Sequence, residues 1–317
     1  MPNAIVWGGS AGIGRAIVDA LVERGHSVGV VARGRDRLAA LEVDHAGRVT
    51  TVSADVGDAA ALSAAVDTLM ADGAPTIWVN CAMATSFSRF AEMEVEEFDR
   101  IVRTTFLGQV NGMRLALKHM TRGNIVCVGS GLGYRPVPGQ SAYCASKHAI
   151  DGFVGSVRSE LLKSRPELSL GLVQLPAHDT PQFTWARNRL SQKPQPAPPV
   201  HTPQVAARAV MKAIDTNARE LLVGMPVFKL VFGDMVLPGY IDRKLAKVGI
   251  DMQKSGTPEP GGRPDNLFGP VDHASTPSGG FDGDIKDNAI TLDADLARKL
   301  VFGGVVAIAF VLGLLIG

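Results

Sequence analysis

The sequence predicts an α/β fold with a doubly wound parallel sheet, followed by a C-terminal extension. Short β-branched apolar runs, each about as long as a buried strand, alternate with longer segments of helical periodicity. The first run, residues 4–7, leads through a glycine-rich loop into an amphipathic helix that reaches about Arg24. With 317 residues, the chain is long enough for one large α/β domain, expected over residues 1–224, and for further segments after it.

The glycine-rich loop after the first strand predicts a phosphate-binding site. It carries Gly8, Gly12 and Gly14, with Ser10 and Ile13 between them. Glycines let the backbone approach a pyrophosphate closely, and the start of the following helix supplies free N–H groups and a partial positive charge. A strand, such a loop and a helix in this order are typical of dinucleotide binding.

The end of the second expected strand, residues 28–32, bears on the choice of cofactor. Arg33 follows this strand directly, and Arg35 and Arg37 add positive charge nearby. A carboxylate here would accept hydrogen bonds from the ribose hydroxyls of NAD, whereas an arginine suits the 2′-phosphate of NADP. A solvated arginine at a helix start is the alternative, but the missing carboxylate also favours NADP. Further strands are expected at residues 49–54, 76–83, 125–128, 170–175 and 220–224.

The stretch from Ser130 to Lys147 carries three side chains suited to proton chemistry. Ser130 follows the strand at residues 125–128, at the sheet edge where open α/β sheets bind ligands. Tyr143 begins a helical pattern, and Lys147 lies one turn later on the same face. A nearby ammonium favours the phenolate, so Tyr143 is suited to exchange a proton with an alcohol or carbonyl oxygen that Ser130 binds. The alternative is a helix-start tyrosine beside a solvated lysine.

Ser130 followed by Tyr143-x-x-x-Lys147, together with the Gly-x-x-x-Gly-x-Gly spacing of the loop, resembles the short-chain dehydrogenase/reductase family over about residues 1–224. The resemblance implies a Rossmann-type fold and hydride transfer between NADP(H) and a carbonyl or alcohol. It implies that Tyr143 is the acid/base, that Ser130 binds the substrate oxygen, and that Lys147 holds the ribose and lowers the phenol pKa.

The resemblance assigns roles at other strand ends as well. It places an adenine contact at Asp55 and Val56, and a nicotinamide contact in the loop from Pro176 to Thr180. Asp55 is alternatively the N-cap of the next helix. The cofactor-binding residues are thus expected to be Gly8, Ser10, Gly12, Ile13, Gly14, Arg33, Asp55, Val56, Asn80, Ala82, Tyr143, Lys147, Pro176 and Thr180.

The chain departs from the family pattern at several positions, one of which is Cys81. Thr105 stands at the catalytic asparagine position of the family, in a helix expected over residues 95–120, and its hydroxyl can still bond a water. Met83 adds bulk where the family keeps glycine, and Trp7 replaces a usual threonine. These departures motivate an alternative function, a membrane-tethered nucleotide-binding scaffold with little or no turnover. Epimerisation through a transient ketone is a third reading.

Composition excludes other classes of site. The net charge is only +1, with no basic cluster of the kind that nucleic-acid binding needs. The three cysteines are widely separated and are expected to be reduced, in a cytoplasmic domain. His178 has no second ligand at metal spacing, so we expect a solvated loop histidine and no metal site.

The remaining segments are expected to surround the substrate and to reach a membrane. Residues 182–200 are rich in proline and are a candidate lid over the substrate. Residues 225–254 should form a helical substrate-side extension, and residues 255–290 a mostly disordered Pro/Gly-rich linker. Residues 291–317 end in 18 uncharged, largely apolar residues, which predict a membrane anchor and favour a lipophilic substrate. A helix buried in the core of a homo-oligomer is the alternative.

Overall fold

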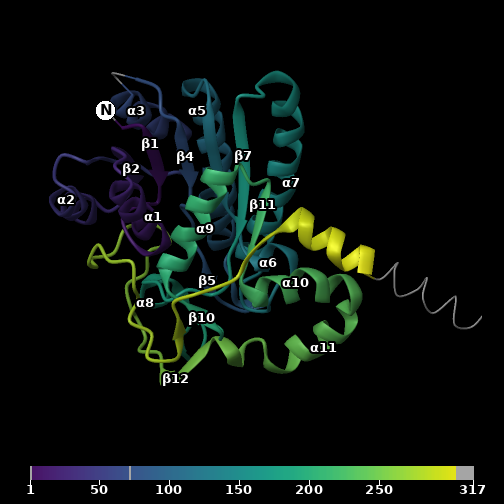
Figure 1. Ribbon diagram of the computed structural model, residues 1–317. Coiled ribbons are helices and arrows are strands. Elements are labelled where there is room, and N and C mark those ends of the chain that lie inside the picture. The colour runs from purple at the N-terminus through teal and green to yellow at the C-terminus, as the bar shows by residue number, and fades with distance from the viewer. Residues whose placement is uncertain (1, 71–72, 305–317) are drawn as a thin grey trace, which may run out of the picture.

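The central sheet of the computed structural model, which describes residues 2–70 and 73–304, has eight strands in the order β14-β11-β7-β6-β4-β1-β2-β3 (Figure 1). All adjacent pairs are parallel except β11–β14, so β14 is an antiparallel edge strand. The strands are β1 (Ala4–Trp7), β2 (Val28–Ala32), β3 (Val49–Ser53), β4 (Ile77–Asn80), β6 (Gly123–Val128), β7 (Leu168–Gln174), β11 (Glu220–Val223) and β14 (Thr291–Asp293). The expected doubly wound parallel sheet is confirmed.

Helices cover both faces of this sheet. The helices α1 (Gly12–Glu23), α2 (Arg35–Asp44) and α9 (Pro203–Thr216) pack on one face, and α3 (Ala59–Leu69), α5 (Gly108–His119) and α7 (Ser141–Ser164) on the other. Successive residues of a strand point to opposite faces. Accordingly, Ala4 and Val6 of β1 belong to the first hydrophobic core and Ile5 and Trp7 to the second. Strands buried on both faces explain the continuous apolar runs in the sequence.

The direction of winding reverses between β1 and β4. From β1 the chain adds β2 and β3 on one side, and the later strands follow on the other side of β4. The carboxyl ends of β1 and β4 approach so closely that a Cβ built on Gly8 would lie 2.7 Å from the Cα of Ala82. Ligands of open α/β sheets bind in the crevice at such a switch point.

The helix expected over residues 95–120 is interrupted. It consists of α4 (Val95–Val102), a π-helical segment (Arg103–Leu107) and α5. A π-helical segment adds a residue to one turn, which rotates the side chains that follow it, and such segments often lie at functional sites. Thr105 lies inside this segment.

Residues 255–290 are not the disordered linker that their composition predicted. The strand β12 (Lys254–Pro258) pairs with β9 (Gln192–Pro194), and β13 (Ile285–Lys286) pairs with β10 (Val200–His201). Between them, residues 259–281, here called the strap, cross the carboxyl edge of the sheet. The strap has little apolar surface of its own to bury; arginine side chains of the domain bind its backbone carbonyls instead.

The C-terminal part also differs from expectation where the structure describes it. Residues 291–293, expected to begin a helix, form β14, and residues 294–304 are helical. Arg298 binds Glu220 of β11 at 2.8 Å. Within residues 2–70 and 73–304, no helix is long and apolar enough to cross a membrane. Most of the expected anchor, residues 305–317, lies outside the described residues, so the structure gives that prediction no support.

Candidate active site

A cavity of about 870 Å³ opens at the carboxyl edge of the sheet, at the switch point between β1 and β4. Most of the residues singled out in the sequence line it. They are Gly8, Ser10, Gly12, Ile13, Gly14, Arg33, Val56, Ala82, Ser130, Tyr143, Lys147, Pro176 and Thr180. Three others, Asp55, Asn80 and Thr105, do not line it.

The glycine loop forms a cradle that larger residues would fill. A Cβ on Gly14 would lie 2.1 Å from the carbonyl oxygen of Gly8, and Gly8 has a φ of +80°, which L side chains rarely adopt. The loop therefore closes tightly against the start of α1, whose N-terminal N–H groups and dipole favour an anion. These features fit the pyrophosphate of a dinucleotide.

Arg33 and Arg37 line one end of the cavity, and Arg100 lies near Arg33. Burial lowers the pKa of Arg33, and repulsion from Arg100 and Arg37 adds to this effect, whereas the nearby Asp55 carboxylate opposes it. Arg37 also stacks on Trp185, with its guanidinium carbon 5.0 Å from the ring centroid. Arg100 is already paired with Asp55, so the guanidinium groups of Arg33 and Arg37 in the cavity wall are the ones that fit the 2′-phosphate of NADP.

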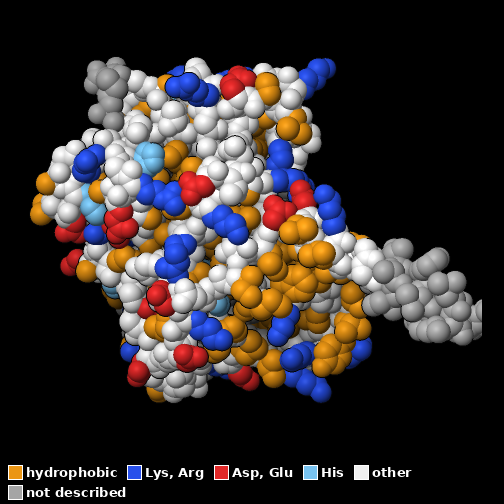
Figure 2. Space-filling view, viewed as in Figure 1, with side chains coloured by type: hydrophobic (Ala, Val, Ile, Leu, Met, Phe, Trp, Pro, Cys, Tyr) orange, Lys and Arg blue, Asp and Glu red, His pale blue; other side chains and the backbone are white. Residues whose placement is uncertain are grey.

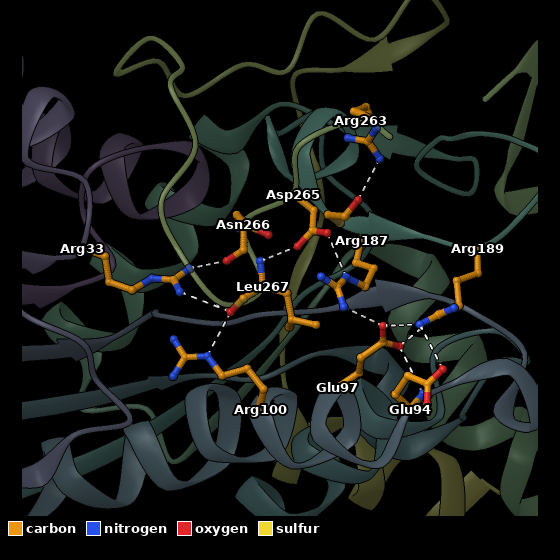
Figure 3. A network of polar contacts seen from close by, with 11 residues as sticks. Arg33, Glu94, Glu97, Arg100, Arg187, Arg189, Arg263, Asp265, Asn266 and Leu267 are labelled. Atoms are coloured by element: carbon orange, nitrogen blue, oxygen red, sulfur yellow. Dashed lines mark hydrogen bonds and ion pairs between the residues drawn. The ribbon is translucent and has the colours of Figure 1, made fainter. Parts of the chain in front are cut away.

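The strap binds all three arginines through its backbone carbonyls, and Arg37 donates to the carbonyl of Val271 at 2.5 Å. Arg33 donates hydrogen bonds to the carbonyls of Asn266 at 2.6 Å and Leu267 at 3.3 Å, and Arg100 donates to Leu267 at 2.9 Å (Figure 3). Leu267 itself is fully buried, in a cluster with Ala84 that Tyr143 packs against. The strap reaches the cavity, which Asn266 lines, and nothing in the composition of the strap indicated this position.

An ion-pair network holds the strap to the rest of the fold. Arg187 binds Asp265 of the strap at 2.8 Å and Glu97 of α4 at 2.7 Å (Figure 3). Arg189 binds Glu97 at 2.6 Å, and the two arginines hold the pKa of this buried carboxyl below its usual value. A buried carboxylate is stable when it is paired in this way.

Asp55 has a different environment from the one expected. Its carboxylate binds Arg100 and accepts a hydrogen bond from the backbone of Gly57 at 2.9 Å, and the pKa of Asp55 is lowered by these contacts against the effect of burial. The alternative role as N-cap of α3 belongs to Asp58, which accepts from the N–H groups of Ala60 and Ala61. Val56, the next residue, lines the cavity.

Ser130, Tyr143 and Lys147 face the same part of the cavity. Ser130 follows β6, and its Oγ accepts a hydrogen bond from the N–H of Leu132 at 3.1 Å, which leaves its hydroxyl hydrogen free to donate. Tyr143 and Lys147 lie one turn apart on α7. The Lys147 Nζ donates to the Val128 carbonyl at 2.7 Å and lies 5.6 Å from the centroid of the Tyr143 ring.

The expectation that Lys147 lowers the phenol pKa is wrong for the protein without cofactor. Burial raises the pKa of Tyr143 well above its usual value, although a hydrogen bond with Ser130 opposes the shift. Burial also lowers the pKa of Lys147 to about 8. Desolvation disfavours both charged forms, and it is the largest cause of each shift. Tyr143 is therefore a protonated phenol at neutral pH.

Thr105 does not face Lys147. Its hydroxyl donates to the Ala84 carbonyl at 2.8 Å and accepts from the Ala84 N–H at 2.9 Å, so it fixes the loop after β4. Gln109, which the sequence did not single out, is buried and donates to the carbonyl of Val128 at 3.1 Å. Lys147 donates to the same carbonyl, and the Gln109 Oε1 has no partner among the described residues. The one signal in the sequence for Gln109 is that it lies four residues, about one helical turn, after Thr105.

Two further expectations concern buried side chains. Asn80 accepts a hydrogen bond from the Trp78 indole at 3.2 Å and donates to the Cys127 sulfur at 3.7 Å, so it joins strands behind the cavity. His178 is buried and not solvated as expected; burial lowers its pKa to about 4. In the described part of the chain, His, Cys, Asp and Glu side chains form no group that could hold a metal ion.

Several known proteins are similar to this chain in sequence or in fold. The chain is 29% identical over 263 residues to the uncharacterized oxidoreductase YxnA of Bacillus subtilis, covering 80% of this chain and 74% of that protein. It is 31% identical to an NADPH-dependent pterin aldehyde reductase of Arabidopsis thaliana, over 53% of this chain and 72% of that protein. The fold matches a short-chain dehydrogenase structure from Streptomyces avermitilis with a TM-score of 0.66 and 24% identity, covering 77% and 94% of the two chains.

The family model described as short chain dehydrogenase matches residues 2–187. This region contains the glycine cradle, the arginines at the end of β2, and the Ser130, Tyr143 and Lys147 group. It makes up more than half of the 317 residues. The protein therefore belongs to the short-chain dehydrogenase family and is an oxidoreductase of that family.

Proposed function

We propose that the protein interconverts a carbonyl and an alcohol with NADP(H) as the hydride carrier. The observation that carries this proposal is that one cavity is lined by the glycine cradle, Arg33, Ser130, Tyr143 and Lys147. NADPH, when bound, supplies the hydride to the substrate carbon. The cradle is suited to hold its pyrophosphate, and Arg33 its 2′-phosphate.

The protein's own groups then handle the oxygen. The hydroxyl of Ser130, whose Oγ accepts from the N–H of Leu132, donates a hydrogen bond to the substrate oxygen. Tyr143 is a protonated phenol at neutral pH, and it gives its proton to the same oxygen as the carbonyl is reduced. Lys147 binds the ribose and stabilises the phenolate that remains. In the reverse direction Tyr143 must first lose its proton, so alcohol oxidation requires a higher pH.

Apolar cavity walls support a lipophilic substrate. Several large apolar side chains line the cavity, namely Leu132, Val137, Leu230, Leu245 and Met252. Such walls exclude water from the reacting atoms and favour an apolar carbonyl compound. The apolar sequence of residues 300–317 supports membrane anchoring of a cytoplasmic domain as part of the same proposal.

The test is NADPH consumption by the full-length protein with a panel of lipophilic aldehydes and ketones. We expect wild type to consume NADPH and Tyr143→Phe to bind it without turnover, since the phenylalanine keeps the ring and lacks the proton. If both proteins bind NADPH and neither consumes it, the protein is a nucleotide-binding scaffold. If substrate is converted while NADPH is retained without net consumption, the reaction is an epimerisation.

A further inference from the structure

The C-terminal extension presents a broad apolar surface to solvent. It is formed by α10 (Gly224–Val236) and α11 (Pro238–Val248), at the lower right of the molecule (Figure 1, Figure 2). Large apolar side chains cluster there with high exposure: Met235 60%, Val236 72%, Leu237 55% and Tyr240 56%. We call this cluster, with Met225 and Val248, the apolar face.

Within residues 2–70 and 73–304, the helix α11 is little covered by the rest of the fold. None of its eleven residues is buried, although its sequence is amphipathic. Exposed apolar residues scattered singly are normal, whereas a contiguous apolar patch marks an interaction site. Ile241 and Leu245 of α11 are half-buried toward the protein, whereas Tyr240 and Val248 stay exposed beside the apolar residues at the end of α10. Exposed apolar side chains that gather in this way are stabilised when a partner covers them.

The charges around the apolar face select the partner. Over residues 224–249, four basic side chains, Lys229, Arg243, Lys244 and Lys247, accompany two acidic ones. Both acidic residues, Asp234 and Asp242, bind Arg135 at 2.7 and 2.5 Å. The basic side chains are therefore in excess, and Figure 2 shows blue lysine and arginine atoms at the margin of the orange surface. An apolar helix face edged by lysine and arginine is typical of helices that lie in the surface of an anionic bilayer.

The same face borders the mouth of the cavity and the end of the described chain. Met225 and Met252 are partly exposed and also line the cavity, so the cavity opens beside the apolar face. Residues 294–304 pack on α10, where Ala294 and Ala297 join Val231 in one hydrophobic cluster. The 13 residues that follow, 305–317, contain no charged side chain.

We propose that the apolar face of α10 and α11 docks flat on an anionic lipid bilayer, with the mouth of the cavity directed at the lipid. A lipophilic substrate then passes from the membrane into the cavity without crossing water. The docking is separate from the reductase reaction and from the anchor: it requires the side chains of α10 and α11 to enter the interface.

A tryptophan reporter in the full-length protein tests the docking. Tyr240→Trp places the indole in the apolar face, and Val43→Trp places it on α2, where the native valine is 78% exposed. Vesicles of phosphatidylcholine brominated in the acyl chains, with or without phosphatidylserine, quench tryptophans that enter the lipid. Wild type, whose Trp7 and Trp78 are buried and whose Trp185 is half-buried, gives the background. We expect strong quenching of Tyr240→Trp with phosphatidylserine present and no added quenching of Val43→Trp.

The charge arm uses Arg243→Glu with Lys247→Glu. Each basic residue near an anionic surface strengthens membrane binding about fivefold. The double variant should therefore bind vesicles about 25-fold more weakly, or more weakly still because the charge is reversed. Unchanged NADPH binding shows that it folds. Three results overturn the proposal: no vesicle binding, vesicle binding with equal quenching of both reporters, or a Tyr240→Trp indole buried by self-association without lipid. The second result means tethering by the C-terminal segment alone, and the third means that a second copy covers the face.

Discussion

Arg33 provides the sharpest test of cofactor selection, because the structure gives its guanidinium two separate partners. It has five N–H donors, and it uses two of its nitrogens on the strap carbonyls of Asn266 and Leu267. The remaining donors are available to a 2′-phosphate. Arg33→Ala removes both functions, but the two make different predictions for NADPH and NADH, since only NADPH carries the phosphate.

The expected magnitude follows from the charge of both groups. A hydrogen bond to a charged group contributes about 1.5–3 kcal/mol. At about 1.4 kcal/mol per tenfold change, Arg33→Ala should weaken NADPH binding about 10- to 150-fold. The loss of two strap contacts weakens NADH binding too, but by a smaller factor. The ratio of the two dissociation constants should therefore shift toward NADH by at least about tenfold.

The assay is a fluorescence titration of both reduced cofactors with wild type, Arg33→Ala and a control. Arg24→Ala is the matched control, because Arg24 is an exposed arginine at the end of α1 that pairs with Asp215, away from the cavity. It should change neither affinity. Equal weakening of NADPH and NADH by Arg33→Ala would refute the phosphate role and leave Arg33 as a residue that only holds the strap.

Three further predictions concern the strap and the catalytic group. Leu267→Ala removes a fully buried side chain from the strap, at a cost of about 2 kcal/mol or more in stability. Residues 259–281 should therefore be cleaved faster in limited proteolysis, and NADPH and NADH should dissociate faster to the same degree. Unchanged proteolysis would contradict this prediction. Gln109→Met should lower kcat about tenfold and leave the NADPH affinity unchanged, because it removes the amide beside Lys147. Thr105→Val should mainly lower the melting temperature, because it removes the hydrogen bonds to Ala84. The opposite pattern would restore the catalytic role to Thr105. The affinity for NADPH should fall about fivefold as the pH rises through about 8, because Lys147 is charged below its pKa and neutral above it. Lys147→Met should bind NADPH weakly at every pH, without this change in affinity. A change of equal size in the variant would assign the pH dependence to another group.

The sequence by itself determined the features that depend on local order. The apolar runs, the glycine loop after β1 and the positions of Ser130, Tyr143 and Lys147 are encoded over a few residues each, and they identified the sheet and the family correctly. Helical spacing alone puts Tyr143 and Lys147 on one face of α7. Parallel strands then bring their carboxyl ends to one edge, which is why residues distant in sequence share one cavity.

Only the tertiary structure decided the features that depend on contacts between distant segments. The strap has the composition of a disordered linker, and it is ordered because arginines more than 160 residues earlier bind its carbonyls. The side chain beside Lys147 is Gln109 because a π-helical segment rotates the helix and Thr105 binds Ala84 instead. Burial, and not the spacing of Tyr143 and Lys147, sets the direction of both pKa shifts. Desolvation is a property of the whole surrounding fold, and no local pattern in the chain encodes it.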